Sequence, residues 1–206
     1  MNDPVRLAVL VSGGGTNLQA IIDSQKSGII KNAQIQLVIS SNPNAYALMR
    51  AKENGIAQEV ISKKEFKTTE KTEEQIMKTL EQYGIELIVL AGYMQVLSKN
   101  FTKRYEGRII NVHPSLIPAF CGDGFYGLRV HEAALKKGVK VTGATVHFVN
   151  EITDGGEIIM QKAVRVLKND TPETLQKRVM QLAEWKILPR AVEKISRKII
   201  KEREKK

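Results

Sequence analysis

The sequence is poor in cysteine and in aromatic residues, and it contains no long apolar run. Cys121 is the only cysteine among 206 residues, so no disulfide can form within the chain, and we expect a reducing, cytoplasmic compartment. No apolar stretch approaches the roughly 18 residues that a membrane span requires, and the N-terminal residues lack the pattern of a signal peptide. Aromatic residues make up 5% of the chain and are not interleaved with basic ones, which argues against stacking on single-stranded nucleic acid.

Charge of one sign is in excess, because the net charge is +10. Part of it lies in residues 196–206, which hold six basic and two acidic residues. Cations are favourable at the C-terminal end of a helix, so we predict a basic helix or tail over residues 190–206. A positive field also attracts small anionic substrates. We therefore expect small-molecule partners, no nucleic acid and no membrane, with a monomer and a homodimer both open.

Apolar runs alternate with helical patterns along the first half of the chain. Strands are predicted over residues 6–12, 35–40, 57–62 and 86–94. Between the last two, apolar residues at positions 76, 77, 80 and 83 predict an amphipathic helix over 69–83. Continuous apolar strands indicate a parallel sheet that is covered by helices on both faces.

The second half is β-rich and then helical. The runs GRIINVH, KVTGATVHFV and GEIIMQKAVRV have little helix between the last two, which predicts antiparallel additions to the sheet. A helical C-terminus is expected from about Pro172 to Lys201. No repeat or linker divides the chain, so we predict a single α/β domain over residues 1–206.

Three glycines, Gly13 to Gly15, separate the first strand from a helix that is expected from Asn17 onward. Such a turn points backbone N–H groups and the positive end of the helix dipole at one spot, which favours an anion. No lysine follows the glycines, as a P-loop would require, and Leu18 stands where a dinucleotide motif has its last glycine. The pattern favours a monophosphate without metal, with side-chain donors from Thr16 and Asn17. A tight turn that needs a positive φ is the alternative.

Three histidines occur, and His113 is the strongest candidate for chemistry. It ends an apolar strand, where open α/β sheets bind ligands, and Asn111 lies two residues earlier on the same side of the strand. An amide beside a histidine suits a reaction that develops negative charge on oxygen, such as acyl transfer. We interpret His147 as packing or hydrogen bonding within its strand, and His131 as lying near the start of a helix.

A carboxylate and two glycines form the sequence Asp-Gly-Gly at residues 154–156. The glycines would let the loop turn Asp154 inward, and near His113 the carboxylate would raise the pKa of the imidazole. Covalent catalysis is disfavoured, because no G-x-S-x-G occurs and Cys121 has no obvious base. No H-E-x-x-H and no paired cysteines occur, so we predict no metal site.

Taken in order, SGGGTNLQAII, VLAGYMQVLS, INVHPSLIP, GATVHFV and EITDGGEIIMQ resemble the phosphoribosylglycinamide formyltransferase family, over roughly residues 6–190. The resemblance implies a Rossmann-like formyltransferase fold. It also implies transfer of the formyl group of 10-formyltetrahydrofolate, without a metal, to the amine of glycinamide ribonucleotide, a step of de novo purine biosynthesis. The implied catalytic trio is Asn111, His113 and Asp154.

The resemblance also implies two binding sites. The substrate phosphate would lie on Gly15, Thr16 and Asn17, and its glycinamide end would meet Glu184. The residues implied for the folate pocket are Met94, Gln95, Val96, Leu97 and Asn111, with the loop 150–154.

Four departures from the family are visible. The segment between Phe120 and His131 is longer than in simpler members, and Arg129 stands nearest to an additional histidine of many members. Near Thr69 the arginine that often meets the folate tail is missing, and Trp185 replaces the usual histidine after the glutamate. Other enzymes of this fold that use the same folate, a hydrolase and a tRNA formyltransferase, share the trio and are alternatives, although we expect neither of their additional domains here. A non-catalytic nucleotide- or RNA-binding module is a further alternative.

Overall fold

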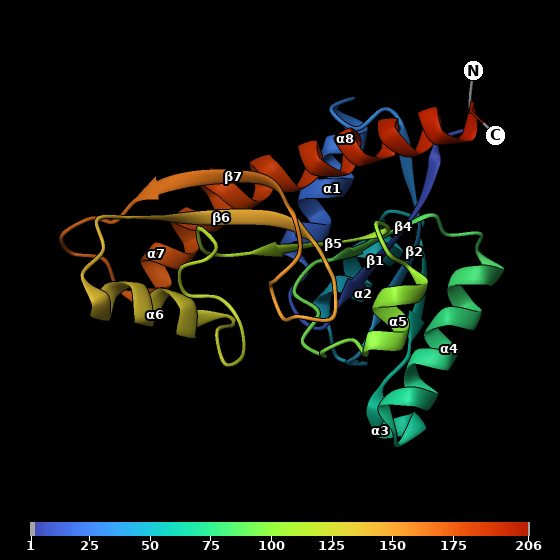
Figure 1. Ribbon diagram of the computed structural model, residues 1–206, viewed down its shortest axis with the longest axis horizontal. Coiled ribbons are helices and arrows are strands. Elements are labelled where there is room, and N and C mark those ends of the chain that lie inside the picture. Colours follow the sequence, from blue (N-terminus) through green and yellow to red (C-terminus); the bar gives the residue numbers. More distant parts are fainter. Residues whose placement is uncertain (1–2, 206) are drawn as a thin grey trace.

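The computed structural model describes residues 3–205, which form an α/β domain (Figure 1). Its strands are β1 (Val5–Val11), β2 (Ala33–Ser40), β3 (Ala57–Val60), β4 (Leu87–Leu90), β5 (Ile109–His113), β6 (Val141–Phe148) and β7 (Ile158–Arg165). Its helices are α1 (Thr16–Lys26), α2 (Tyr46–Glu53), α3 (Lys63–Phe66), α4 (Thr69–Gln82), α5 (Lys99–Arg104), α6 (Leu128–Lys137), α7 (Pro172–Val179) and α8 (Trp185–Arg203). A π-helical segment, Met180–Glu184, joins α7 to α8.

Within residues 3–205 the strands form one seven-stranded sheet in the order β3-β2-β1-β4-β5-β6-β7. The pairs among the first five strands are parallel, whereas β6 runs antiparallel to β5 and β7 runs antiparallel to β6. This confirms the predicted mixed sheet. The chain leaves β1 for β2 on one side and later returns to β4 on the other. The carboxyl ends of β1 and β4 therefore flank a topological switch point, where such sheets bind ligands.

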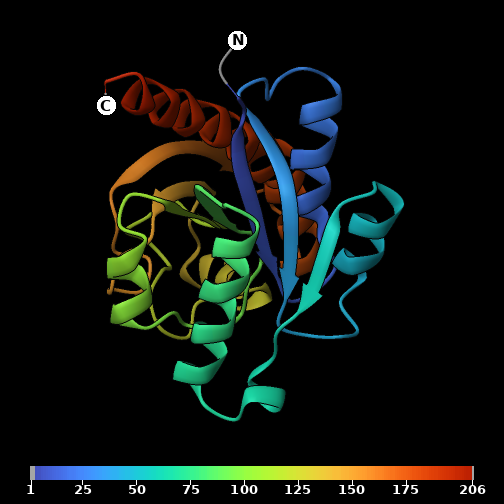
Figure 2. The same ribbon diagram turned by 90° about the vertical axis from the view of Figure 1, so that its right-hand side faces the viewer.

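Alternate residues of the central strands enter two separate cores. Leu7 and Val9 of β1 pack with α1, α2, α7 and α8, while Ala8 and Leu10 pack with α4 and α5. Figure 2 shows α1 and α2 on one side of β1–β3 and α4 and α5 on the other. Because successive side chains of a strand point to opposite faces, a continuous apolar run is what such a central strand needs.

Two features depart from the expected pattern. The run ELIVLAGYM was expected to be a strand over 86–94, but β4 ends at Leu90, where its pairing with Asn111 of β5 also ends. Gly92 then turns the chain away from the sheet with a φ of 74°. At the C-terminus the predicted helix is present, but the π-helical segment at residues 180–184 interrupts it.

Candidate functional site

Asn111 and His113 lie at the carboxyl end of β5, as expected from the sequence. The apolar residues around them bury the strand between β4 and β6, and the strand ends just before Pro114. His113 is 4% exposed. Its Nδ1 lies 3.4 Å from Asp154 Oδ2, and its Nε2 lies 2.8 Å from the carbonyl oxygen of Phe120. Because that carbonyl can only accept, Nε2 carries the proton of this hydrogen bond.

Asp154 reaches His113 from the loop between β6 and β7. Asp154 itself adopts the left-handed region, with a φ of 55°. The glycines after it are needed for close approach rather than for a positive φ, because a Cβ on Gly156 would lie 1.8 Å from the carbonyl oxygen of Phe148. The loop is thereby folded tightly against the end of β6, and the carboxylate turns toward β5.

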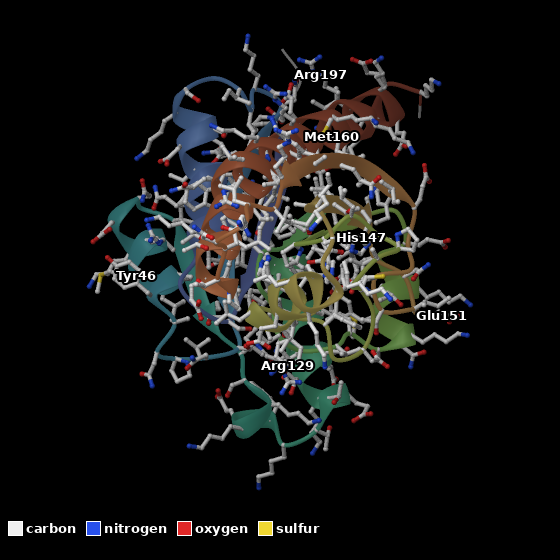
Figure 3. All side chains as sticks on the ribbon, turned by 90° about the vertical axis from the view of Figure 1, so that its left-hand side faces the viewer. Tyr46, Arg129, His147, Glu151, Met160 and Arg197 are labelled. Carbon is white, nitrogen blue, oxygen red and sulfur yellow. The ribbon has the colours of Figure 1, made fainter. Side chains whose placement is uncertain are left out.

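His147 is a fourth member of this cluster. Its expected hydrogen bonding within the strand is present, but its position beside the trio was not predicted. Its Nδ1 donates to the carbonyl oxygen of Phe148 at 2.7 Å. Its Nε2 lies 3.3 Å from Asn111 Nδ2 and 3.5 Å from Asp154 Oδ1. The register of β5 and β6 pairs Asn111 with His147, so the antiparallel pairing expected from the sequence could have suggested it. Figure 3 shows His147 in the interior and Glu151 at the periphery.

The segment Phe120–Gly124 covers the cluster, which the sequence did not predict. The carbonyl of Phe120 accepts from His113, and the N–H of Gly122 donates to Asp154 Oδ2 at 2.9 Å. Thr153 Oγ1 donates to Asp123 Oδ1 at 2.9 Å, which ties this segment to the loop that carries Asp154. Both nitrogens of His113 therefore face protein groups in this structure.

The electrostatics of the cluster favour a carboxylate and a neutral imidazole. Burial raises the pKa of Asp154, but a hydrogen bond from His147, the nearby His113 and the N–H of Gly122 together lower it below its usual value. Burial lowers the pKa of His113, and Asp154 and Phe120 oppose this shift without overcoming it. Asp154 therefore raises the pKa of His113, as expected, but burial has the larger effect and the net shift is downward. A second proton on His113 would enter at Nδ1, facing the carboxylate.

A pocket of about 500 Å³ opens beside these residues. Its lining includes the trio Asn111, His113 and Asp154, and also Met94, Gln95, Val96 and Leu97. Met94 and Val96 are 55% and 73% exposed, which is unusual for apolar side chains beside a cluster of polar ones. The structure thus brings the predicted trio and the predicted Met94–Leu97 wall together in one concavity.

The glycine loop lies at the carboxyl end of β1. A Cβ on Gly13 or Gly14 would meet no protein atom within 4 Å, so packing does not require glycine there. Gly15 is different, since its φ is 71° and a Cβ would lie 2.6 Å from Ala47 Cβ. The alternative of a tight turn therefore accounts for Gly15 alone. Bare backbone at the other two positions is what close approach of a ligand needs.

Glu184 and Asn17 form a buried pair next to this loop. Asn17 Nδ2 donates to Glu184 Oε2 at 2.7 Å, so this amide group faces the carboxylate. Burial raises the pKa of Glu184 to about 7, while the hydrogen bond from Asn17 lowers it. Thr16 Oγ1 lies 3.8 Å from Met180 Sδ. The predicted substrate residues Gly15, Thr16, Asn17 and Glu184 are thus gathered around the start of α1 and the π-helical segment.

The remaining candidates take no part in the trio. His131 is fully buried in α6, where burial lowers its pKa to about 4. Burial raises the pKa of the Cys121 thiol, which disfavours a thiolate nucleophile. Among residues 3–205, no group of three or more His, Cys, Asp or Glu side chains could hold a metal ion. In the same part of the chain no helix combines the length and the apolar character that crossing a membrane requires.

The chain matches the formyl transferase family over residues 5–192, and it belongs to that family. It is 42% identical to the phosphoribosylglycinamide formyltransferase of Haemophilus influenzae, over 89% of this chain and 84% of that protein. It is 44% identical to the human trifunctional purine biosynthetic protein adenosine-3 over 93% of this chain, but it spans only 18% of that protein.

Solved structures agree with these matches. The glycinamide ribonucleotide transformylase 1 of Symbiobacterium toebii is similar with a TM-score of 0.89 and 38% identity, over 96% of this chain and 90% of that chain. The phosphoribosylglycinamide formyltransferase of Brucella melitensis has a TM-score of 0.85 and 41% identity, over 94% and 96% of the respective chains. The resemblance to phosphoribosylglycinamide formyltransferases that the sequence suggested is confirmed, and these relatives are transferases by name.

Proposed function

We propose that this protein transfers the formyl group of 10-formyltetrahydrofolate to the amine of glycinamide ribonucleotide, a step of purine biosynthesis. One observation carries the proposal: an amide, a buried imidazole and a carboxyl group line the same pocket as the exposed apolar wall at residues 94–97. Acyl transfer needs donors for a developing oxyanion and a group that takes up a proton. Relatives named for this reaction support the choice of substrates.

The pocket suits a flat folate ring system. Apolar side chains such as Val96, Leu97 and Ile152 can cover the faces of a ring, and backbone groups of the surrounding loops can meet its polar edge. The folate supplies the formyl carbon and N10 as the leaving nitrogen. No lysine or arginine lines the pocket within the described residues, so the anionic tail of the folate would extend beyond it.

In the proposed reaction the primary amine attacks the formyl carbon, the new C–N bond forms, and the bond from that carbon to N10 breaks. Asn111 Nδ2 and His113 Nε2 donate to the oxyanion of the tetrahedral intermediate. His113 can do so only after its hydrogen bond to the carbonyl oxygen of Phe120 breaks, because that bond uses the same Nε2 proton in this structure. The negative charge of the oxyanion favours a second proton on the imidazole of His113, and Asp154 stabilises the resulting imidazolium. The proton lost by the attacking amine ends on N10.

The phosphate of glycinamide ribonucleotide would lie on the glycine loop. The open space over Gly13 and Gly14 and the N-terminus of α1 suit a phosphate without a metal. Asn17 would contribute through its backbone N–H, because its side-chain amide is bonded to Glu184. Glu184 would accept a hydrogen bond from the glycinamide end.

Two other formyl-folate enzymes of this fold, a hydrolase and a tRNA formyltransferase, remain alternatives for the chemistry. The hydrolase would consume the folate without an amine. The tRNA formyltransferase would require charged tRNA in place of glycinamide ribonucleotide. A nucleotide-binding module without catalysis would show no dependence on folate at all.

The test is the folate absorbance change with and without glycinamide ribonucleotide, for the unaltered protein and for Asp154→Asn. We expect turnover only when both substrates are present, and a loss of kcat of about 10²- to 10³-fold in the variant, with little change in either KM. Asp3→Asn makes the same chemical change at an exposed residue ahead of β1 and should leave kcat intact. Near-normal kcat in Asp154→Asn, or turnover without the amine, would refute the proposal.

A further inference from the structure

A second groove, separate from the folate pocket, runs along the outer side of α1. It has a volume of about 540 Å³ and lies between α1, the start of α8 and one side chain of α2. These helices pack side by side (Figure 1). Its lining includes Thr16, Asp23, Arg50, Trp185, Lys186 and Arg190. Within the described residues, none of these lines the pocket that holds the trio.

The groove has an excess of positive charge. Lys186 and Arg190 are exposed and one helical turn apart, and no carboxylate in residues 3–205 lies within ion-pair distance of either. Like charges at this spacing repel each other and destabilise a helix. Asp23 is the one acid in the described lining, and its Oδ1 accepts from Gln19 Nε2 at 2.9 Å. The surplus charge therefore favours an anionic ligand.

Arg50 is already held in place for such a ligand. Its Nε donates to the carbonyl oxygen of Gly14 at 2.9 Å, and its Nη1 donates to Gln19 Oε1 at 3.0 Å. Its guanidinium lies over the ring of Tyr46, 5.0 Å from the centroid, and Figure 3 shows Tyr46 at the outer edge of α2. A guanidinium that is already fixed loses little entropy when it binds an anion.

The other part of the groove is apolar and aromatic. Trp185 and Pro189 form a wall on α8, and Ile29, which is 52% exposed, lies in the segment that follows α1. The Trp185 indole Nε1 is a buried donor without an acceptor in the described part of the chain. An indole ring beside cations is suited to a ligand that joins a flat ring to an anionic group.

We propose that this groove binds a nucleoside 5′-monophosphate, with the phosphate against Arg50, Lys186 and Arg190 and the base against Trp185 and Ile29. The site goes beyond the proposed formyl transfer: it shares no lining residue with the pocket of the trio, and Thr16 is the one residue of its described lining that is also a candidate for the substrate phosphate. Arg50 also bonds to Gly14, so an anion in the groove contacts a residue that supports the glycine loop. Occupation of the groove would therefore change the affinity of that loop for its own ligand.

Trp185 is the only tryptophan in the chain, so intrinsic tryptophan fluorescence reports on the wall of this groove. The experiment titrates the full chain with adenosine 5′-monophosphate, and then with ribose 5-phosphate, inorganic phosphate and adenosine. We expect a saturable change with the nucleotide and weaker binding of each fragment. The double variant Lys186→Glu/Arg190→Glu should raise the Kd for the nucleotide about tenfold or more.

The matched control is Lys103→Glu/Lys136→Glu, which makes the same charge change at exposed residues of α5 and α6 and should leave the Kd unchanged. An unsaturable titration, equal Kd values for the double variant and the unaltered protein, or equally tight binding of ribose 5-phosphate would overturn the proposal. So would simple competition by glycinamide ribonucleotide together with an equal rise of its KM in the double variant, because the groove would then belong to the substrate site. The fluorescence titration needs no turnover, so it stands apart from any failure of the formyl transfer assay.

Discussion

Replacing Glu184 by glutamine should stabilise the protein at alkaline pH. Glu184 is 6% exposed, and burial raises its pKa to about 7 from a usual value of 4.5. The native state therefore keeps the proton over a range in which the unfolded chain has lost it. The free energy of unfolding is not affected by Glu184 below about pH 4.5. It falls as the pH rises from there, and the decrease due to Glu184 is complete above about pH 7. Glutamine has the same shape and carries no charge, so it removes this loss.

The magnitude follows from the difference in pKa. A shift from 4.5 to about 7 corresponds to about 3 kcal/mol at pH 8. Glutamine can still accept from Asn17 Nδ2, so the hydrogen bond is kept. Urea unfolding at pH 5 and pH 8 measures the free energy of unfolding of both proteins. The variant should gain about 3 kcal/mol relative to the unaltered protein at pH 8, and only a small part of that at pH 5.

Equal gains at the two pH values, or no gain at pH 8, would refute this reasoning, because the effect must follow the ionisation of the carboxyl group. The conservative variant Gln176→Glu, on the neighbouring helix α7, serves as a check that an added charge elsewhere has no such pH profile. Glu184→Gln should also lower formyl transfer, since a neutral amide is a weaker acceptor for the substrate. A gain in stability with a loss of activity is typical of a buried charge kept for function.

Two further predictions concern the cluster and the core. His147→Phe removes a hydrogen bond that lowers the pKa of Asp154, so the acid limb of the pH profile of kcat/KM should move to higher pH. The variant His147→Gln keeps a donor and should move this limb less. Identical acid limbs for the two variants and the unaltered protein would contradict the assigned contact. Phe101→Ala deletes a fully buried ring between α5 and the sheet, so it should lower the free energy of unfolding in urea by about 3–5 kcal/mol without changing the pH profile. A decrease below about 1 kcal/mol would show that the core around Phe101 is not packed as described.

Much of the fold could be predicted because the signals are local. Continuous apolar runs mark the parallel strands, and the spacing at 76, 77, 80 and 83 marks α4. Asn111 and His113 share one strand, so their common side follows from the period of two. The end of β4 was less predictable, because apolar residues beyond Leu90 leave the sheet to line the pocket.

The features that were missed depend on contacts between distant segments. His147 joins the cluster through its pairing with Asn111, 36 residues earlier. The contact of Phe120 with His113 depends on a left-handed residue in an irregular segment, for which no periodic pattern exists. The net pKa shift of His113 depends on how deeply the ring is buried. The burial of a side chain is harder to predict from a sequence than the presence of a nearby charged residue such as Asp154. The role of Asp154 and the bound substrates stay predictions until they are tested.

The number of residues in the π-helical segment determines the direction in which the side chains of α8 point around the helix axis. In an α-helix each residue advances about 100° around the axis, and one π turn holds one residue more than an α turn. Removing a single residue from 180–184 would rotate the rest of α8 by about that angle relative to α7. The carboxyl group of Glu184, which faces Asn17, and the indole of Trp185 would then point in other directions. One deletion would therefore disrupt both the glycine loop and the outer groove.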